Sequence, residues 1–203
     1  MYQIRLHGRG GQGVVTAAEL IAAAAIHDGR YALAFPSFGS ERTGAPVEAY
    51  CRIDDAPIRG REPVDAPDAV LVLDATLLAR PGIFRGLRPH GLALVNSAKD
   101  LDIAEVPQLR TVPATRIALA RTGRALPNVP MLGAFAAASG TISREAMHTA
   151  IELRFPGALA RANRDGADEA YVRMTAAENE DEAVEFDVPA ALAAEREAHH
   201  VVG

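Results

Sequence analysis

Hydrophobic and polar positions alternate over Tyr2–Leu6, which predicts a β-strand that runs into the glycine-rich sequence HGRGGQG. A helix is expected next, because apolar side chains then recur at helical spacing, at Val14, Val15, Ala18, Ile21, Ala22 and Ala25. Gly29 is expected to end this helix. Tyr31–Phe35 predicts a second strand, which Pro36 ends. Such a strand–loop–helix–strand unit indicates a parallel sheet with a right-handed crossover.

Alternation resumes over Val47–Ile53, where apolar residues face one side and Glu48, Tyr50 and Arg52 the other. This pattern predicts a strand with one buried face. The pair Asp54–Asp55 predicts a turn into a short partner strand at Pro57–Arg59.

Two continuous apolar runs predict central strands that are buried on both faces. The first, Ala69–Leu73, ends at Asp74, and the second, Leu92–Val95, ends at Asn96. A helix-like segment, Leu77–Arg85, separates them.

The chain becomes helical in its second half, with four predicted helices at Ala114–Thr122, Val129–Ser139, Ser143–Arg154 and Gly157–Met174. Ser143 is expected to cap its helix, with Glu145 in the first turn. The chain after Thr175 is acidic and contains Pro189. We therefore predict an α/β fold: a single Rossmann-like domain over residues 1–175, with a mostly parallel sheet and a helical C-terminal half, and an extended C-terminal arm over residues 176–203.

Composition narrows the classes of function. The 203 residues are 49% hydrophobic and carry a formal net charge of −5, which leaves no basic surface for nucleic acid. The N-terminus has no secretory pattern and no apolar run is long enough to span a membrane, so we expect a cytoplasmic protein with no membrane partner. The only cysteine, Cys51, excludes a disulfide within the chain and a four-cysteine cluster, and its strand pattern predicts a buried thiol.

The glycine-rich loop is the first candidate binding site, with Gly8, Gly10, Gly11, Gln12 and Gly13 as its residues. The spacing matches the dinucleotide-binding pattern, and free N–H groups at a helix N-terminus favour an anion. That pattern also requires an acidic residue at the end of the second strand, which is absent here, and no lysine follows the loop as in a Walker A motif. A self-sufficient NAD(P)-binding oxidoreductase is therefore an alternative, as is close packing of the glycines without a ligand.

The polar loop SFGSERTGAP is the second candidate site, with Ser37, Gly39, Glu41 and Arg42 as its residues. Loops at the carboxyl ends of parallel strands face the crevice where α/β proteins bind ligands. A solvated surface loop is the alternative interpretation.

No catalytic constellation emerges from the sequence, which has neither a Gly-x-Ser-x-Gly elbow nor an HExxH helix. The histidines are scattered, at His7, His27, His90, His148 and His199–His200. Asp74 ends a predicted central strand, where a cap or turn role is favoured over chemistry. We therefore predict no catalytic residue and no metal ligand in this chain.

Three blocks, in order, carry a specific resemblance: RLHGRGGQGVVTAAELIA, AFPSFGSERTGAPVEAYCRIDDAPIR and NVPMLGAFAAASG. They resemble the γ subunit of pyruvate:ferredoxin oxidoreductases and of related 2-oxoacid:acceptor oxidoreductases. The resemblance implies a complex in which α and β subunits hold thiamine diphosphate and Mg²⁺, and a ferredoxin-like δ subunit holds [4Fe–4S] clusters. Such enzymes decarboxylate a 2-oxoacid, pass electrons to ferredoxin or another acceptor, in some cases through a flavoprotein subunit, and release an acyl-coenzyme A.

The resemblance also implies the role of this chain. It would form a separate α/β domain packed against α and β on the coenzyme A side, so the residues of both loops would contact coenzyme A, another anion or a partner subunit. The isolated chain would bind none of these cofactors and would be inactive. Pyruvate, 2-oxoglutarate, branched-chain oxoacids and phenylglyoxylate all remain possible substrates, and a purely structural scaffold remains an alternative. The acidic arm, with apolar Val184, Phe186 and Leu192, is expected to wrap a partner subunit.

Overall fold

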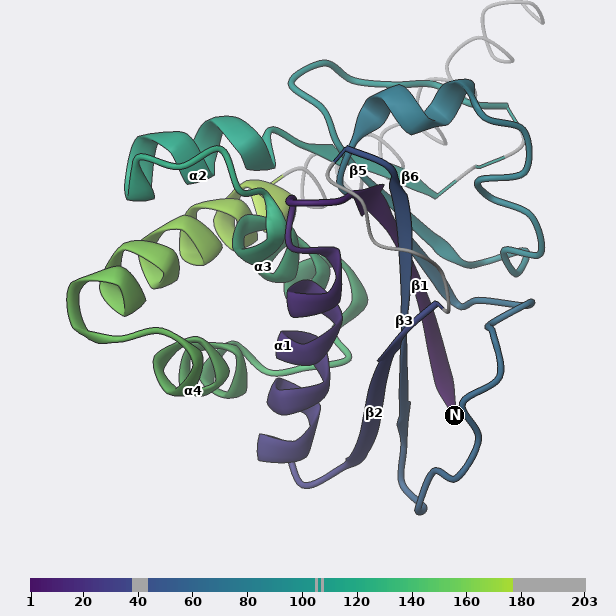
Figure 1. Cartoon of the computed structure of the whole chain (residues 1–203), viewed down its shortest axis with the longest axis horizontal. Helices are drawn as coiled ribbons and strands as arrows, with labels where there is room; N and C mark the ends of the chain where they lie inside the picture. Colours follow the sequence, from purple (N-terminus) through teal and green to yellow (C-terminus); the bar gives the residue numbers. More distant parts are fainter. Residues whose placement is uncertain (38–43, 105, 107, 177–203) are drawn as a thin grey trace, which may run out of the picture.

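A six-stranded mixed sheet with the strand order β2-β3-β1-β4-β5-β6 forms the centre of the molecule (Figure 1). The computed structural model describes residues 1–37, 44–104, 106 and 108–176. The strands are β1 (Tyr2–Arg9), β2 (Tyr31–Pro36), β3 (Pro46–Asp54), β4 (Ala69–Val72), β5 (Leu92–Asn96) and β6 (Leu109–Val112). Because β1, β4, β5 and β6 pair in parallel, the predicted α/β class with a mostly parallel sheet is confirmed.

The first strand–loop–helix–strand unit forms as predicted, but its two strands are not neighbours. Helix α1 (Val14–His27) follows β1 and leads into β2. Strand β3 lies between β1 and β2 and pairs antiparallel with both. Tyr2 of β1 lies opposite Ile53 of β3, and Tyr31 of β2 lies opposite Asp54 of β3. Strands β1 and β2 therefore run in the same direction, separated by one strand.

The helices gather on one side of the sheet (Figure 1). They are α1, α2 (Ala114–Thr122), α3 (Asn128–Ser139), α4 (Arg144–Arg154) and a further helix over residues 157–176. All four helices expected in the second half are confirmed, and Ser143 caps α4 by accepting from the backbone N–H of Ala146. Their apolar faces and that of α1 form the main core with Ile4 and Leu6 of β1, which are fully buried. No helix in the described ranges is long and apolar enough to cross a membrane.

The opposite face of the sheet is covered by irregular chain, which corrects two predictions. Pro57–Arg59 is not a strand: the segment is irregular, and Pro57 has no backbone N–H to donate to a neighbouring strand. Just beyond it, the guanidinium of Arg52 donates to the carbonyls of Gly60 and Glu62 and holds the irregular chain on the sheet. Leu77–Arg85 is not a regular helix either. It consists of a 3-10 turn, η1 (Ala75–Ala79), and further turns, because Pro81-Gly82 follows at once and interrupts helical hydrogen bonding.

Strand β3 also differs from its prediction, because both of its faces are buried. Tyr50 and Arg52, expected to face solvent, are 4% and 7% exposed beneath the irregular chain. Arg5 of β1 is buried on the same face and donates to the carbonyls of Val64 and Arg85. Cys51 points into the helical core, and burial raises the pKa of its thiol, so the predicted structural role is confirmed.

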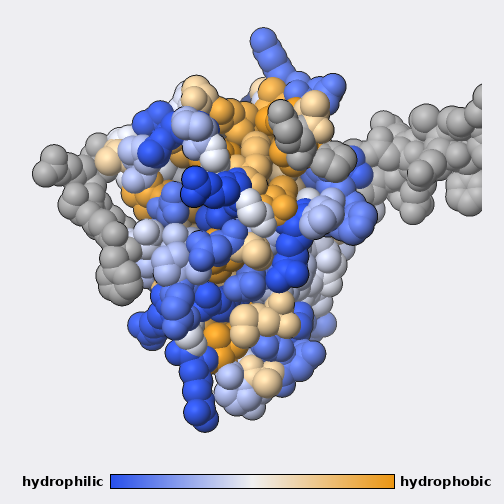
Figure 2. Space-filling model, turned by 90° about the vertical axis from the view of Figure 1, so that its right-hand side faces the viewer, coloured by the Kyte–Doolittle hydropathy of each residue, from blue (hydrophilic) through white to orange (hydrophobic). Residues whose placement is uncertain are grey.

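Apolar side chains reach the surface where this irregular chain covers β4, β5 and β6. Figure 2 views this side of the molecule and shows hydrophobic surface at its upper end. On this face of the sheet, a buried cluster that includes Val70, Val72 and Val95 is flanked by partly buried apolar residues, which are Ala75, Leu78, Phe84, Leu87, Leu101 and Leu109. The surface on this side is therefore apolar in part.

Candidate functional site

The glycine-rich loop joins the carboxyl end of β1 to the N-terminus of α1, as predicted. The loop turns back on itself, with the backbone N–H of Gln12 donating to the carbonyl of Arg9 at 3.1 Å. Gly11 and Gly13 have φ values of 95° and 76°, in the left-handed region that glycine adopts without strain. Gly13 is the N-cap residue of α1, and its carbonyl accepts the first helical hydrogen bond, from the N–H of Ala17 at 2.9 Å.

Gln12 braces this loop against the neighbouring parallel strand. Its Oε1 accepts from the backbone N–H of Arg9 at 2.8 Å, and its Nε2 donates to Oδ2 of Asp74 at 2.8 Å. Asp74 follows β4 and caps η1 by accepting from the N–H of Thr76 at 3.0 Å, so its predicted cap role is confirmed. Both atoms of the Gln12 amide are thus engaged within the chain, which makes Gln12 a structural support of the loop.

Three residues that were not predicted as part of the site hydrogen-bond with one another beside the loop: Arg9, Asp74 and Thr76. Nε of Arg9 lies 3.2 Å from Oδ2 of Asp74, and Nη2 of Arg9 donates to Oγ1 of Thr76 at 2.8 Å. Burial would raise the pKa of Asp74, but hydrogen bonds from Thr76 and Gln12 outweigh it, so the pKa lies below its ordinary value. The sequence did offer one sign that Asp74 lies near the loop. Asp74 follows a predicted strand, and the carboxyl ends of parallel strands meet at one edge of the sheet.

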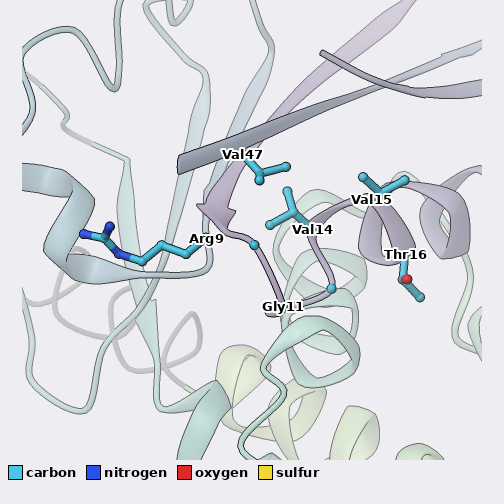
Figure 3. Close-up of a pocket in the computed structure, with 8 residues that line it drawn as sticks. Arg9, Gly11, Val14, Val15, Thr16 and Val47 are labelled. Atoms are coloured by element: carbon cyan, nitrogen blue, oxygen red, sulfur yellow. The ribbon is translucent and has the colours of Figure 1, made fainter. Parts of the chain in front are cut away.

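A pocket of about 300 Å³ opens beside the loop (Figure 3). Its lining consists of Arg9, Gly10, Gly11, Gly13, Val14, Val15, Thr16 and Val47. Figure 3 shows the side chain of Arg9 extending away from the glycines, while Val14 and Val47 lie next to each other. No described residue accepts a hydrogen bond from the backbone N–H of Val14, Val15 or Thr16. The first turn of α1 therefore offers three N–H groups and the positive end of a helix dipole to an anion.

Close contacts with other residues require glycine at Gly8 and Gly13 but not at Gly11. A Cβ at Gly8 would lie 2.5 Å from Cγ2 of Val14, and a Cβ at Gly13 would lie 2.6 Å from Nδ2 of Asn128. A Cβ at Gly11 would meet nothing within 4 Å. Close packing thus accounts for Gly8 and Gly13, whereas Gly11 faces open space beside the pocket.

The two ends of the second loop are fixed by the sheet and by the first loop. The backbone N–H of Ser37 donates to the carbonyl of Glu48 at 2.9 Å. At the other end, Gly44 donates to the carbonyl of Gly10 at 3.1 Å, and Gly10 donates to the carbonyl of Ala45 at 2.9 Å. The structure therefore brings the end of the second loop against the first. The predicted residues Gly39, Glu41 and Arg42 lie outside the described residues.

A buried polar chain supports this part of the sheet from the face opposite α1. His7, 5% exposed, accepts from Nε of Arg5 at Nε2, and its Nδ1 lies 3.5 Å from Oε1 of Glu48. The hydroxyl of Tyr50 donates to Oε2 of the same carboxylate at 3.0 Å. The hydrogen bond with His7 is the largest cause that lowers the pKa of Glu48, from 4.5 to about 2. Sequence alone gave no reason to connect His7 with Glu48.

Glu48 should make the stability of the fold depend on pH. Its folded pKa lies below its unfolded one, so its carboxylate stabilises the folded state above pH 4.5, and this contribution is lost as the pH falls towards 2. Because the side chain is 42% exposed, solvent screening limits the effect to about 1 kcal/mol. In urea unfolding, Glu48→Gln should have a lower free energy of unfolding than the unsubstituted protein at pH 6, and the difference should be smaller at pH 3. Equal losses at the two pH values would contradict the assignment.

The strand order argues against the dinucleotide alternative. In dinucleotide-binding folds the ribose-binding carboxylate ends the strand adjacent to the glycine-rich one. Here β2 ends at Pro36 and lies two strand spacings, about 10 Å, from β1, because β3 intervenes. The next strand end beside the loop carries Asp74, which is already bound to Gln12 and Arg9.

The fold and loop define a class of α/β domain that has the glycine-rich loop and the free N–H groups at the start of α1 but lacks the ribose-binding arrangement of dinucleotide-binding domains. Residues 3–172 match the model of the pyruvate ferredoxin/flavodoxin oxidoreductase family, and the chain belongs to this family. The family inferred from the three sequence blocks is thereby confirmed.

Relatives of known name agree with this assignment. The chain is 47% identical over 171 residues to pyruvate synthase subunit PorC of Methanothermobacter thermautotrophicus, covering 84% of this chain and 94% of the relative. It is 45% identical over 177 residues to the pyruvate/ketoisovalerate oxidoreductases common subunit gamma of Thermococcus kodakarensis, covering 84% and 96%.

Solved structures share the fold. The crystal structure of pyruvate oxidoreductase subunit PORC from Thermotoga maritima superposes with a TM-score of 0.74 at 40% identity, covering 84% of this chain and 94% of that chain. A 2-oxoglutarate:ferredoxin oxidoreductase from Magnetococcus marinus gives a TM-score of 0.71 at 18% identity, covering 86% of this chain and 31% of that chain. The second likeness shows the fold alone.

Proposed function

We propose that this chain is the γ subunit of a multisubunit 2-oxoacid:acceptor oxidoreductase and acts only within that complex. The observation that carries the proposal is the match to relatives named as PorC or gamma subunits, at 44–47% identity and across 94–98% of the length of several of them. The reaction would be the oxidative decarboxylation of a 2-oxoacid to an acyl-coenzyme A. Pyruvate is the first substrate to test, because it appears in the names of these relatives.

The cofactors of that reaction would be held mainly by other subunits. Thiamine diphosphate with Mg²⁺ would supply the decarboxylation chemistry in the α and β subunits, and [4Fe–4S] clusters in a ferredoxin-like δ subunit would carry electrons to ferredoxin or another acceptor. Among the described residues, no group of three His, Cys, Asp or Glu side chains is placed to hold a metal ion. The donor set that is present, helix N–H groups beside an open glycine, suits an anion such as the phosphates of coenzyme A.

The chain would contribute two surfaces to such a complex. The pocket beside Gly11 would face the coenzyme A side, and the second loop, with Ser37, Gly39, Glu41 and Arg42, would complete it. The apolar surface over β4, β5 and β6 would contact a larger subunit, because burying it on association is favourable. The acidic arm of residues 176–203 would wrap the same or another partner.

Gly11 provides the test of the coenzyme A side. In the assembled enzyme, Gly11→Val should raise the KM for coenzyme A about tenfold, because the new side chain would occupy the open space beside the pocket. Gly29→Val is the matched control, since Gly29 also has a positive φ, of 79°, and open surroundings but lies at the far end of α1. Arg42→Ala should likewise raise this KM. The measurement is steady-state kinetics of the complex isolated through this chain, with iron, sulfide and thiamine contents as the check of assembly.

Three results would contradict this proposal. Unchanged kinetics with weakened assembly in Gly11→Val and Arg42→Ala would identify a structural scaffold. Micromolar binding of NAD or NADP by the isolated chain, measured by calorimetry, would favour the self-sufficient oxidoreductase. Recovery of an active monomer without larger subunits would overturn the subunit role itself.

A further inference from the structure

Strand β6 is an open edge of the sheet, because the strand order ends there. The N–H of Ala93 in β5 donates to the carbonyl of Gln108, so the alternation of a parallel ladder turns the backbone groups of Leu109 and Thr111 away from β5. No described residue hydrogen-bonds with these outward N–H and C=O groups. An open edge of this kind is a template for a further strand, and folded proteins usually cover it.

An apolar surface adjoins this edge on the face of the sheet opposite the helices. Leu109 of β6 is partly buried against the cluster that includes Val70, Val72 and Val95, and Figure 2 shows hydrophobic surface on this side. A cavity of about 320 Å³ opens on the same face, since Ile83 belongs both to the cluster and to the cavity lining. The edge and the surface together therefore suit a strand with one apolar face.

The C-terminal arm contains one stretch with that pattern. Apolar and acidic residues alternate strictly over Val184–Val188, VEFDV, which is the period of a strand with one apolar side. Phe186, at its centre, is the only phenylalanine of the arm. The stretch lies beyond residues 3–172, the part of the chain that matches the family, so the family match does not account for it.

Charge favours β6 over β2, the open edge at the other side of the sheet. Six of the ten residues 178–187 are acidic and none is basic. The cavity on the β6 side is lined in part by Arg80 and Arg85, which form no ion pair with a described residue. Near the start of β2 the charges cancel instead, because Asp54 and Asp55 pair with cationic groups. The acidic stretch is therefore attracted to the side of β6.

The described chain ends within reach of β6. Glu169, in the helix of residues 157–176, pairs with Arg121 of α2 at 2.8 Å, and α2 follows β6 after one residue. Figure 1 shows that this helix runs towards the sheet. Residues 177–183 span up to about 23 Å when extended, whereas α2 is about 14 Å long. The connection to Val184 is thus long enough.

We propose that Val184–Val188 pairs with the open edge of β6 in the same chain and adds a seventh strand to the sheet. Its backbone would bond with the outward groups of Leu109 and Thr111, and its three apolar side chains would cover the apolar surface beside the cavity. Residues after Pro189, and the surface over β4 and β5, stay available for the partner subunit proposed above. The strand would form whether or not the complex binds coenzyme A.

Cysteine cross-linking of the full chain tests this placement, because Cys51 is fully buried and does not compete. Thr111→Cys lies on the same face as Leu109, so on mild oxidation it should form an intrachain disulfide with a cysteine at position 184, 186 or 188. Cysteines at positions 185 and 187 face the other side and should react about fivefold less. Tyr31→Cys is the matched control, since Tyr31 is 50% exposed on the other open edge, and it should form none of these disulfides. Mass spectrometry of the linked peptides is the measurement.

Hydrogen exchange gives a second measurement without new cysteines. In the full chain the N–H groups of Leu109 and Thr111 should exchange about tenfold more slowly than in Phe186→Asp, which puts a charge on the apolar side of the strand. The N–H groups within α2 should exchange equally in both proteins and serve as the control for folding.

Equal exchange at β6 in the two proteins, or equal cross-linking at all five arm positions, would overturn the proposal. Disulfides that form only between chains, and increase with protein concentration, would assign the edge to a second copy of this chain. Protection of β6 that appears only in the assembled complex would assign the edge to a partner subunit. Either of these results would contradict pairing within one chain.

Discussion

Replacing Gly133 with alanine should destabilise the fold more than most single substitutions in this chain. Gly133 lies within α3 where the helix of residues 157–176 crosses it. A Cβ there would press on the carbonyl oxygen of Ala167 and would lie 2.8 Å from its Cα. Because backbone cannot rotate away as a side chain can, the two helices would have to separate. We expect a loss of about 3 kcal/mol in the free energy of unfolding, measured by urea denaturation followed by circular dichroism.

Gly166 provides the matched control within the same pair of helices. A Cβ at Gly166 would make ordinary contacts, the nearest being Cγ of Pro130 at 3.6 Å. Since glycine is a poor helix former, Gly166→Ala should stabilise the fold by about 0.5–1 kcal/mol. Opposite signs for the two substitutions would locate the helix crossing at Gly133, whereas equal effects would contradict it.

The elements of the fold could be predicted where one periodicity dominates. The helix after the glycine-rich loop and the four helices of the second half show helical spacing. The apolar run Ala69–Leu73 contains the central strand β4, which is buried on both faces as the run indicates. Strand β6 was missed, because LRTV is short and contains a charge, and a sheet edge does not require an apolar run. The prediction of a helix-like segment at Leu77–Arg85 was wrong, because it followed the apolar spacing and gave too little weight to Pro81, which interrupts a helix.

Relations between distant segments could not be predicted in the same way. The alternating pattern predicts that Val47–Ile53 is a strand, but it does not predict that this strand lies between β1 and β2. Likewise, the glycine spacing located the loop, yet the contact of Gly13 with Asn128 depends on how α3 packs on α1. One signal was available: a single asparagine opens the otherwise apolar sequence NVPMLGAFAAAS. Helix interiors tolerate such a residue poorly, which favours a role at the helix end.

Gly13→Ala should disrupt the candidate site and the fold together. The residue has a φ of 76° and a ψ of 34°, so alanine there would be strained by about 1–2 kcal/mol. The contact with Nδ2 of Asn128 would add a steric cost, for a total loss of about 3 kcal/mol. Gly29→Ala separates the two contributions, because Gly29 has a φ of 79° and nothing within 4 Å of its Cβ position. Gly29→Ala should therefore lose only about 1 kcal/mol, measured by the same urea denaturation.

The contact itself is measured by combining Gly13→Ala with Asn128→Ala. Truncating Asn128 removes the atoms that the new Cβ would meet, so the double variant should be more stable than the sum of the single losses predicts, by about 1–2 kcal/mol. Strictly additive losses would mean that Gly13 and Asn128 do not touch, and the packing of the start of α3 against the N-terminus of α1 would then be wrong.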